Sequence, residues 1–270
     1  MIFTLNEAVH LPSCLASLTW CDDVIVVDSF STDQTESITR AAGARFFQRK
    51  FDGFGTQRNW ALEATSPKHE WILILDADER VTPELAIELQ SIAIRAPESI
   101  GGYRVRRRFH MWGRWLRRSS LYPTWVLRLL RRGRVQYVNR GHAETQHVEG
   151  DIGELEHDLI DENLKGFEAW MQRQVKYAVQ DARYEVEMES GEPPLRGDLI
   201  SSDPLVRRAA LKRLASRLPA RGLIYFAYAY GVRGGWRDGR DGLVFCGMRG
   251  LHQQMVELAR YDIERTTDAR

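Results

Sequence analysis

Short apolar runs alternate with amphipathic stretches over the first hundred residues of the chain. The apolar runs are rich in β-branched residues and are short enough to be strands buried on both faces. They predict four strands, at residues 2–5, 24–28, 44–47 and 71–75. Apolar spacing and helix-end signals predict helices at residues 12–19, 33–43, 54–65 and 82–95. This alternation is typical of a parallel sheet covered by helices, so the chain is predicted to be an α/β protein.

The composition changes abruptly after residue 100. Residues 101–140 contain twelve arginines, interleaved with aromatic residues, and no acidic residue. Residues 141–170 contain nine acidic residues and one lysine. Arginines with aromatic residues suit a sugar acceptor that carries phosphates, and they also suit single-stranded nucleic acid. A structural interpretation is open as well: the arginines lie on strands and pair with the acidic segment that follows.

The overall composition limits the class of protein. The chain has 270 residues, of which 43% are hydrophobic, and its 38 basic and 37 acidic residues give a net charge of +1. It therefore has no overall attraction to nucleic acid or to an anionic membrane. Three widely spaced cysteines exclude a disulfide framework and the paired spacing of a zinc site. The sequence shows no leader segment and no apolar run long enough to span a bilayer, so we expect a cytoplasmic protein.

The last hundred residues are predicted to be helical, with breaks near residues 191–194, 219 and 234–235. Residues 205–240 carry nine basic residues and one acidic residue. On a helical projection, one face holds Leu211, Leu214 and Leu218, and Arg208, Lys212 and Arg213 lie away from it. This pattern suits a helix at the surface of an anionic membrane. An ordinary amphipathic helix packed on the rest of the protein is the alternative.

Carboxylates follow three of the predicted strands. Asp76 and Asp78 flank Ala77 directly after the fourth strand, and Glu7 and Asp28 follow the first two. Ligands bind at the carboxyl edge of open α/β sheets, where Asp28 could accept a hydrogen bond from a nucleobase or ribose. Strand alternation is expected to place both carboxylates of the Asp-Ala-Asp segment on one side, where a divalent cation and its diphosphate would relieve their repulsion. The structural alternatives are an acidic turn and a carboxylate that caps the next helix.

A basic side chain is predicted near this edge. Gln57, Arg58 and Asn59 open the third predicted helix, and Arg58 could neutralise a diphosphate. The alternative is a solvated arginine on the helix surface. The sequence has no Gly-x-Gly-x-x-Gly after a strand, no Walker-type loop, no Gly-x-Ser-x-Gly and no His-Glu-x-x-His. These absences disfavour dinucleotide binding, nucleoside triphosphate hydrolysis, serine hydrolases and zinc proteases.

Four ordered segments in the first eighty residues resemble the family 2 glycosyltransferases of GT-A fold, and more narrowly the bacterial lipopolysaccharide inner-core glucosyltransferases. The segments are Thr4-Leu-Asn-Glu7, Val26-Val-Asp28-Ser-x-Ser-Thr-Asp33, Gln57-Arg-Asn-x-Ala61 and Leu75-Asp-Ala-Asp-Glu-Arg80. Weaker similarity continues through Tyr122-Pro-x-Trp-x-x-Arg128-Leu, Gly141-His-Ala-Glu144 and Gly234-Gly-Trp-Arg-Asp-Gly239.

The resemblance implies a Rossmann-like GT-A fold with a mixed, mainly parallel sheet and a helical C-terminal region. It implies a nucleotide-sugar-binding half at residues 1–100, an acceptor-side half at 101–160 and a helical region at 161–270 that associates with the inner face of the cytoplasmic membrane. The implied reaction is an inverting transfer of a hexose from a UDP-sugar, with Mg²⁺ or Mn²⁺, to a lipopolysaccharide or other lipid-linked saccharide. Nucleic acid is not an expected partner.

The resemblance also assigns residues to the donor site. The residues expected to bind the nucleotide-sugar are Thr4, Asn6, Glu7, Asp28, Gln57, Arg58, Asn59, Asp76 and Ala77. Asp78 is expected to hold the metal, together with Asp76.

We favour Glu144 as the base that removes the acceptor proton, because it follows the Asp-Ala-Asp segment at a suitable chain length and lies where the charge pattern reverses. Arg128 is expected to offset charge on the departing diphosphate. The residues expected to contact the acceptor are Trp112, Trp115, Trp125 and His142. Two other functions stay open: a polyanion-binding protein built on residues 101–140, and a sugar nucleotidyltransferase, whose usual glycine-rich basic loop is missing after the first strand.

Overall fold

The computed structural model describes residues 1–140, 143–189 and 219–268. These residues form two compact units, Met1–Gly166 and Phe167–Arg270. We call the first the α/β unit and the second the helical unit. Residues 1–100 and 101–160, which the sequence assigns to the two sides of a catalytic domain, both lie in the α/β unit.

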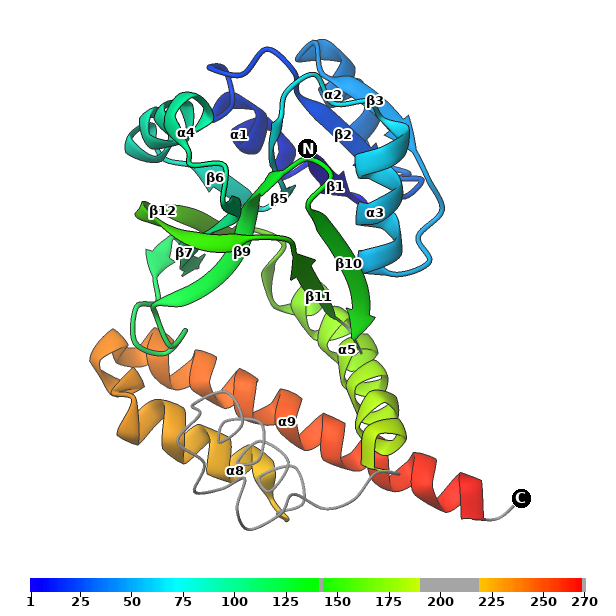
Figure 1. The fold of residues 1–270 in the computed structure, drawn as a ribbon. Helices are drawn as coiled ribbons and strands as arrows, with labels where there is room; N and C mark the ends of the chain where they lie inside the picture. Colours follow the sequence, from blue (N-terminus) through cyan, green and yellow to red (C-terminus); the bar gives the residue numbers. More distant parts are fainter. Residues whose placement is uncertain (141–142, 190–218, 269–270) are drawn as a thin grey trace. The chain divides into compact units, whose positions relative to one another are not determined.

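The first sheet of the α/β unit is parallel and carries helices, as the sequence predicts. Its strands are β1 (Ile2–Thr4), β2 (Ile25–Asp28), β3 (Arg45–Gln48) and β5 (Leu75–Asp76). Its helices are α1 (Leu11–Ala16), α2 (Thr35–Ala41) and α3 (Phe54–Ala64). The strand order is β3-β2-β1-β5, and every neighbouring pair is parallel (Figure 1). The α/β class is therefore confirmed.

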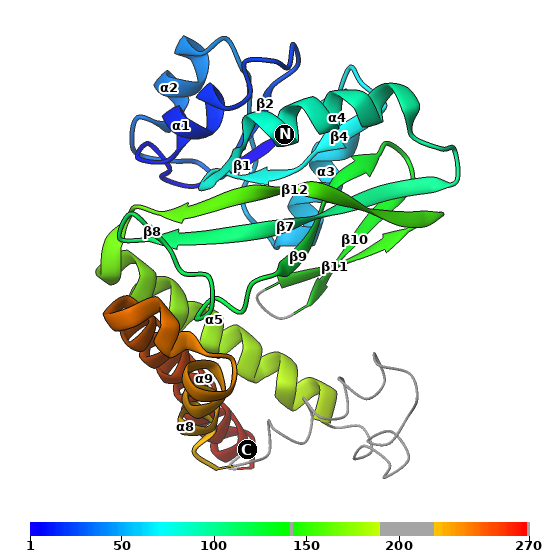
Figure 2. The ribbon, with the colours of Figure 1, turned by 90° about the vertical axis from the view of Figure 1, so that its left-hand side faces the viewer.

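A second sheet is mainly antiparallel and has the order β4-β9-β7-β12-β6, with β8 attached to β7. Its strands are β4 (Trp71–Leu73), β6 (Glu79–Val81), β7 (Ile100–Met111), β8 (Arg114–Trp115), β9 (Thr124–Arg131) and β12 (Asp151–Asn163). Strands β10 (Val135–Arg140) and β11 (Ala143–Val148) form a separate hairpin, and helix α4 (Pro83–Arg95) packs on β12 (Figure 2). The prediction of a single mainly parallel sheet is thus incomplete.

The predicted strand 71–75 is split between the two sheets. Residues 71–73 pair antiparallel with β9, whereas Leu75 and Asp76 pair parallel with β1. Ile74 joins the two short strands and is fully buried. The chain returns to the second sheet at Glu79, where β6 begins. The Asp-Ala-Asp segment therefore lies where the chain passes from one sheet to the other.

One apolar core joins both sheets of the α/β unit. Ile2 and Leu75 contribute from the first sheet, Leu129 and Leu159 from the second, and Leu85 from α4, and each is 3% exposed or less. Apolar side chains removed from water in this way contribute about 1.5–3 kcal/mol each. The core fixes the two sheets relative to each other, and so fixes the edge at which their strands meet.

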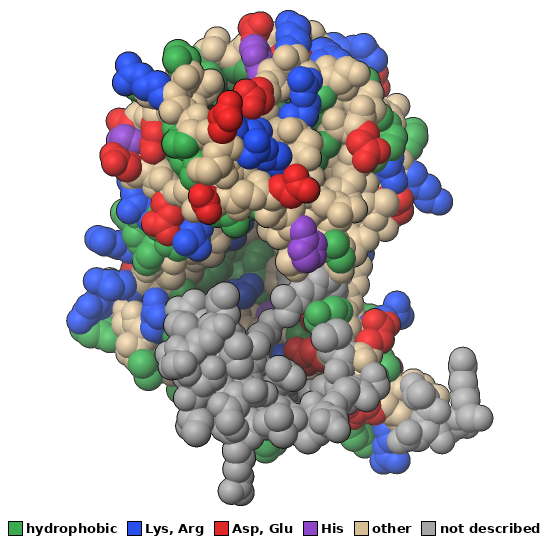
Figure 3. Space-filling view, in the orientation of Figure 1, with side chains coloured by type: hydrophobic (Ala, Val, Ile, Leu, Met, Phe, Trp, Pro, Cys, Tyr) green, Lys and Arg blue, Asp and Glu red, His purple; other side chains and the backbone are tan. Residues whose placement is uncertain are grey.

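The arginines of β7 are paired with carboxylates of β12, its parallel neighbour. Arg104 lies 2.8 Å from Glu154, and Arg106 and Arg108 lie 2.8 and 2.6 Å from the two carboxylate oxygens of Asp158. Acidic and basic side chains are interspersed over the face of the α/β unit in Figure 3. The structural interpretation of this segment is therefore confirmed for β7. The paired arginines of β7 are not free to bind a polyanion, which weakens the polyanion hypothesis.

The helical unit contains a long helix, a helical hairpin and a small core. Its elements are α5 (Gly166–Glu189), α8 (Arg221–Phe226), the π-helical turn η1 (Ala227–Val232), the 3-10 turn η2 (Gly235–Asp238) and α9 (Gly239–Asp268). Ala178, Ala182 and Val256 form the core. The predicted break at 234–235 is confirmed, whereas the predicted start at residue 161 is too early because β12 continues to Asn163.

The predicted amphipathic segment with leucines at 211, 214 and 218 lies outside the described residues. Among the helices that are described, none combines the length and the hydropathy needed to cross a membrane.

Candidate functional site

Three parallel strands of the first sheet end side by side at one edge. β1 ends at Thr4, β2 at Asp28 and β5 at Asp76. The register pairs Thr4 with Asp28, and Phe3 with Asp76. The structure therefore brings residues that were predicted separately to one carboxyl edge, where ligands bind in open α/β sheets.

Asp28 is fully buried at this edge and is bonded by the protein itself. Its carboxylate accepts hydrogen bonds from Thr4 Oγ1 at 2.8 Å, from the Ser31 main-chain N–H at 2.8 Å and from Ser31 Oγ at 2.5 Å. Gln48 Nε2 donates a longer bond of 3.4 Å. These bonds fix the loop after β2. In this structure Asp28 therefore shapes the edge by holding a loop in place.

Asn6 links the loops that follow β1 and β2. Its backbone is left-handed, with φ of 55°, and its Oδ1 accepts a hydrogen bond of 2.8 Å from the Thr32 N–H. Its own N–H donates to Ser31 Oγ at 2.7 Å. The same two loops expose the apolar side chains of Leu5 and Phe30, which the sequence analysis did not single out. An apolar residue within two positions of a strand end is the signal that would have found them.

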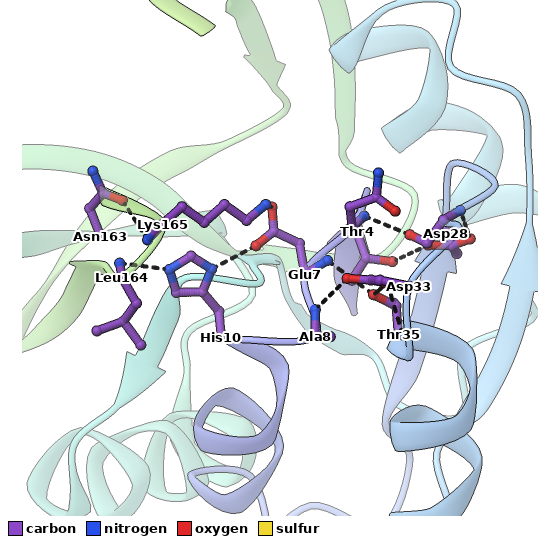
Figure 4. A network of polar contacts seen from close by, with 12 residues as sticks. Thr4, Glu7, Ala8, His10, Asp28, Asp33, Thr35, Asn163, Leu164 and Lys165 are labelled. Carbon is purple, nitrogen blue, oxygen red and sulfur yellow. Dashed lines mark hydrogen bonds and ion pairs between the residues drawn. The ribbon is translucent and has the colours of Figure 1, made fainter. Parts of the chain in front are cut away.

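Figure 4 shows that His10 and Lys165 both reach the carboxylate of Glu7. Glu7 Oε2 lies 2.7 Å from His10 Nδ1, and Oε1 lies 2.6 Å from Lys165 Nζ. His10 Nε2 accepts a hydrogen bond of 2.9 Å from the Leu164 N–H, so the imidazole carries its proton on Nδ1 and donates it to Glu7. Sequence analysis missed both partners, although Lys165 is the one lysine of the acidic segment 141–170.

Two buried arginines hold Asp76. Arg58 Nη2 lies 2.8 Å from Asp76 Oδ1, and Arg128 Nη2 lies 2.5 Å from Oδ2. Each guanidinium also pairs with a second carboxylate, Arg58 with Glu144 and Arg128 with Glu79 at 2.6 Å. Arg58 is 3% exposed, so its interpretation as a solvated arginine on the helix surface is wrong.

The position of Arg128 results from a β-bulge. Tyr103 of β7 pairs with Leu129, but Arg104 pairs with Leu127, so Arg128 is an extra residue on β9. Bulges of this kind re-aim a side chain and are frequent near active sites. The sequence carries no signal for this bulge, because it depends on pairing with a distant strand.

The arginines decide the charge of Asp76. Burial alone would raise the pKa of Asp76, but Arg128 and Arg58 outweigh burial and hold the pKa below its ordinary value. Burial raises the pKa of the neighbouring Glu79 in spite of the attraction of Arg128. Asp76 is therefore ionised and neutralised within the protein, and both of its oxygens are engaged.

Asp78 has the opposite environment. β5 ends at Asp76, so strand alternation does not extend to Asp78, which lies in the turn before β6. Its carboxylate has no hydrogen bond or ion pair with any residue that the structure describes. Burial, followed by the negative charges of Asp161, Asp76 and Glu79, raises its pKa well above the ordinary value. A cation beside Asp78 would remove this penalty.

The donor set fits a cation that also binds substrate phosphates. No group of three or more His, Cys, Asp or Glu side chains within the described part of the chain is arranged to hold a metal ion. Mg²⁺ commonly uses one or two carboxylates and completes its shell with phosphate oxygens and water. Asp78 fits that role, whereas Asp76, its predicted co-ligand, is occupied by two guanidinium groups.

The other predicted donor residues divide into two groups. Gln57 Nε2 donates to Ser29 Oγ at 2.8 Å, and so joins α3 to the loop after β2. Ala77 is buried in the turn between Asp76 and Asp78. Asn59 instead bonds the main chain of Tyr137 through both ends of its amide, each at 2.8 Å. Asn59 thus clamps α3 to β10, which accounts for it without a nucleotide.

The predicted acceptor side is only partly described, because His142 lies outside the described residues. The guanidinium groups of Arg108 and Arg117 contact the ring of Trp115, and those of Arg104 and Arg106 contact the ring of Trp125. Trp112 is exposed in the turn between β7 and β8. Of the three tryptophans, only Trp112 is exposed to solvent, whereas Trp115 and Trp125 are partly buried.

Comparison with known proteins shows the family to which this chain is similar. The sequence profile of Glycosyl transferase family 2 matches residues 1–152. The lipopolysaccharide core biosynthesis glycosyltransferase LpsC of Rhizobium meliloti is 30% identical over 250 residues, which cover 90% of this chain and 84% of LpsC. An uncharacterised glycosyltransferase of Rickettsia bellii is 39% identical over 92 residues, or 34% of this chain and 31% of that protein.

Among solved structures, the mannosyltransferase PcManGT of Pyrobaculum calidifontis, in complex with GDP-Man and Mn²⁺, aligns with a TM-score of 0.49 and 16% sequence identity. The alignment covers 93% of this chain and 85% of that structure.

Proposed function

The chain belongs to glycosyl transferase family 2, and we propose that it moves a hexose, with inversion, from a UDP-sugar to a lipid-linked saccharide such as a lipopolysaccharide core. One observation carries the proposal most directly: a half-buried carboxylate, Asp78, without a described partner at the carboxyl edge of the first sheet. The likeness to LpsC over most of both chains supports the choice of acceptor.

The donor's nucleoside would lie against the loops after β1 and β2. Asn6 and Ser31 hold these two loops together, and Leu5 and Phe30 offer exposed apolar surface for a base. Thr4, Glu7, Asp28 and Gln57 support the site by fixing the loops rather than by presenting free groups. Asp76 would mark the ribose side of the site.

Asp78 would hold Mg²⁺ or Mn²⁺ together with the diphosphate of the donor. When bound, the ion supplies positive charge that offsets the charge developing on the departing diphosphate. Asp76 would contribute indirectly, because its position is fixed by Arg58 and Arg128.

The transfer itself needs a base for the acceptor hydroxyl and an anomeric carbon that the acceptor oxygen attacks. The acceptor oxygen would bond to the anomeric carbon while the bond from that carbon to the diphosphate oxygen breaks, and the electron pair leaves with the diphosphate. The hydroxyl proton would pass to Glu144, which is 12% exposed and held by Arg58. We expect Glu144→Gln to keep donor binding and to slow transfer at least about 10²-fold. Turnover at the wild-type rate would remove Glu144 from this role.

The acceptor would approach Trp112, with the lipid part at the inner face of the cytoplasmic membrane. Val232 and Trp236 of the helical unit are 78% and 54% exposed, and Arg233 and Arg237 lie beside them in sequence. Exposed apolar and aromatic residues next to arginines suit an anionic membrane surface. Flotation with anionic liposomes tests this part, and protein that stays in the soluble fraction would contradict it.

The donor class is tested by calorimetry of UDP binding with and without Mn²⁺, with GDP and CMP as controls. We expect binding of UDP that requires the metal and is lost in Asp78→Ala. If the folded wild-type protein binds no nucleotide under any condition, the proposed function is wrong.

A further inference from the structure

A nucleoside diphosphate adds negative charge to an edge that is already acidic. The carboxylates at or beside this edge belong to Glu7, Asp28, Asp33, Asp76, Asp78, Glu79 and Asp161. One divalent ion at Asp78 would offset only part of the added charge. If the proposed function holds, a cationic side chain that is able to turn towards the diphosphate is also needed.

Three arginines around Asp76 and Glu79 are committed to the fold. Arg58 is shared between Asp76 and Glu144, and Arg128 between Asp76 and Glu79. Arg107 is likewise shared between Glu79 at 3.7 Å and Asp161 at 3.2 Å.

Moving any of these guanidinium groups towards a ligand would strip two carboxylates of a counter-charge. Glu79, a partner of both Arg107 and Arg128, is fully buried, and an unpaired buried charge is strongly destabilising. These three arginines are therefore poor candidates for binding the diphosphate.

Lys165 is different. Its ammonium pairs with a single carboxylate among the described residues, that of Glu7 at 2.6 Å. The backbone beneath it is anchored, because the Lys165 N–H donates to Asn163 Oδ1 at 3.1 Å and the Leu164 N–H donates to His10 Nε2 at 2.9 Å (Figure 4). A fixed backbone with a four-carbon stem lets the ammonium change partners without movement of the fold.

Glu7 does not lose every partner if Lys165 leaves. Its second oxygen keeps the hydrogen bond of 2.7 Å from His10 Nδ1, and His10 is itself held by the Leu164 N–H. The side chain of Glu7 is also 16% exposed, so water can reach it. The exchange of partners is therefore much less costly for Lys165 than for the three arginines.

We propose that Lys165 exchanges Glu7 for the diphosphate of the bound donor and stabilises the nucleoside diphosphate as it departs. In the absence of donor, Glu7 keeps the ammonium at the edge. This role of Lys165 depends on the proposed nucleotide-sugar donor. Lys165 lies outside all of the segments that carry the family resemblance.

The test compares two ligands that differ only in phosphate. Uridine and UDP are titrated, by NMR and calorimetry respectively, into wild-type protein and Lys165→Met in the presence of Mn²⁺. Lys68→Met is the matched control, since Lys68 also pairs with one carboxylate, Asp22 at 3.7 Å, but lies in the segment before β4. Thermal unfolding of each variant confirms that it is folded.

We expect Lys165→Met to weaken UDP binding at least about tenfold and to change uridine binding less than about threefold. Lys68→Met is expected to bind both ligands as the wild type does. Equal UDP affinity in wild type and Lys165→Met would overturn the inference while leaving the proposed function intact.

Equal losses of uridine and UDP in Lys165→Met, reproduced by Glu7→Gln, would show that Lys165 only tethers Glu7 and would also overturn the inference. If the wild type itself binds no UDP, the proposed function fails and this inference fails with it.

Discussion

Replacement of Arg128 by methionine tests whether the buried ion pairs organise the edge of the sheet. The variant removes the guanidinium that lies 2.5 Å from Asp76 and 2.6 Å from Glu79, and leaves an apolar stem in its place. Removal of one partner from a buried ion pair costs about 3–5 kcal/mol. Asp76 keeps Arg58 at 2.8 Å and Glu79 keeps the Asp76 N–H at 3.0 Å, so we expect the lower end, about 3 kcal/mol.

Urea denaturation at neutral pH measures this loss as a lower midpoint with an unchanged slope. In a unit of this size, 3 kcal/mol corresponds to a melting temperature lower by about 6–12 °C. Arg40→Met is the control, because Arg40 is 64% exposed and pairs with Glu36 on the surface, where such a pair contributes about 1 kcal/mol or less. A loss in Arg128→Met no larger than in the control would refute the reasoning.

The same variant has an expected pH signature. The pKa of Asp76 in the folded protein is below its unfolded value, so this group contributes stability that is fully present above the unfolded pKa and is lost as the pH falls through the folded pKa. Without Arg128, the folded pKa of Asp76 rises. Acid unfolding of Arg128→Met should therefore begin at a higher pH than that of the wild type.

Two further variants test the charges beside the site. The folded pKa of Asp78 is raised, so its ionisation opposes folding as the pH rises above the unfolded pKa. Asp78→Asn should therefore stabilise the metal-free protein near neutral pH by about 0.5–2 kcal/mol, measured by thermal unfolding in the presence of a chelator. An unchanged stability would contradict the view that the neighbouring carboxylates oppose ionisation of Asp78. Asp158→Asn removes the negative charge, and one of the two acceptor oxygens, that Arg106 meets at 2.8 Å and Arg108 at 2.6 Å. It should cost about 2–3 kcal/mol and increase heparin binding at low salt. Unchanged heparin binding would mean that these arginines are not neutralised in the wild type.

The parallel sheet was predictable because each of its strands is a short apolar run that can be recognised from consecutive residues alone. The strands at Ile25–Asp28 and Arg45–Gln48 lie within one residue of their predicted bounds. The run 71–75 was misassigned as one strand for a physical reason. Its two halves hydrogen-bond to β9 and β1, which lie far from it in sequence, and apolar pattern alone cannot distinguish one strand from two that share a run.

The arginine-rich segment shows a second limit of sequence analysis. Whether Arg106 is free or paired depends on the register that places Asp158 opposite it, and these residues are 52 positions apart. Composition indicated that arginines and acids occur in successive segments, but it could not decide that β7 and β12 are neighbours. The missed contacts of Glu7 have the same origin, because Lys165 reaches it from the end of β12.

The two carboxylates of the Asp-Ala-Asp segment were expected to act alike, and the structure separates them. Asp76 ends a strand beside Arg58 and the bulged Arg128, and its charge is neutralised twice. Asp78 follows in a turn, where burial and four neighbouring carboxylates oppose its ionisation. A site that must take up a cation together with an anionic ligand benefits from this division. Asp76, which is neutralised, fixes the edge of the sheet. Asp78 gains the most from a cation. The charge of the ligand that the cation does not offset is then balanced by a side chain that is able to move, such as Lys165.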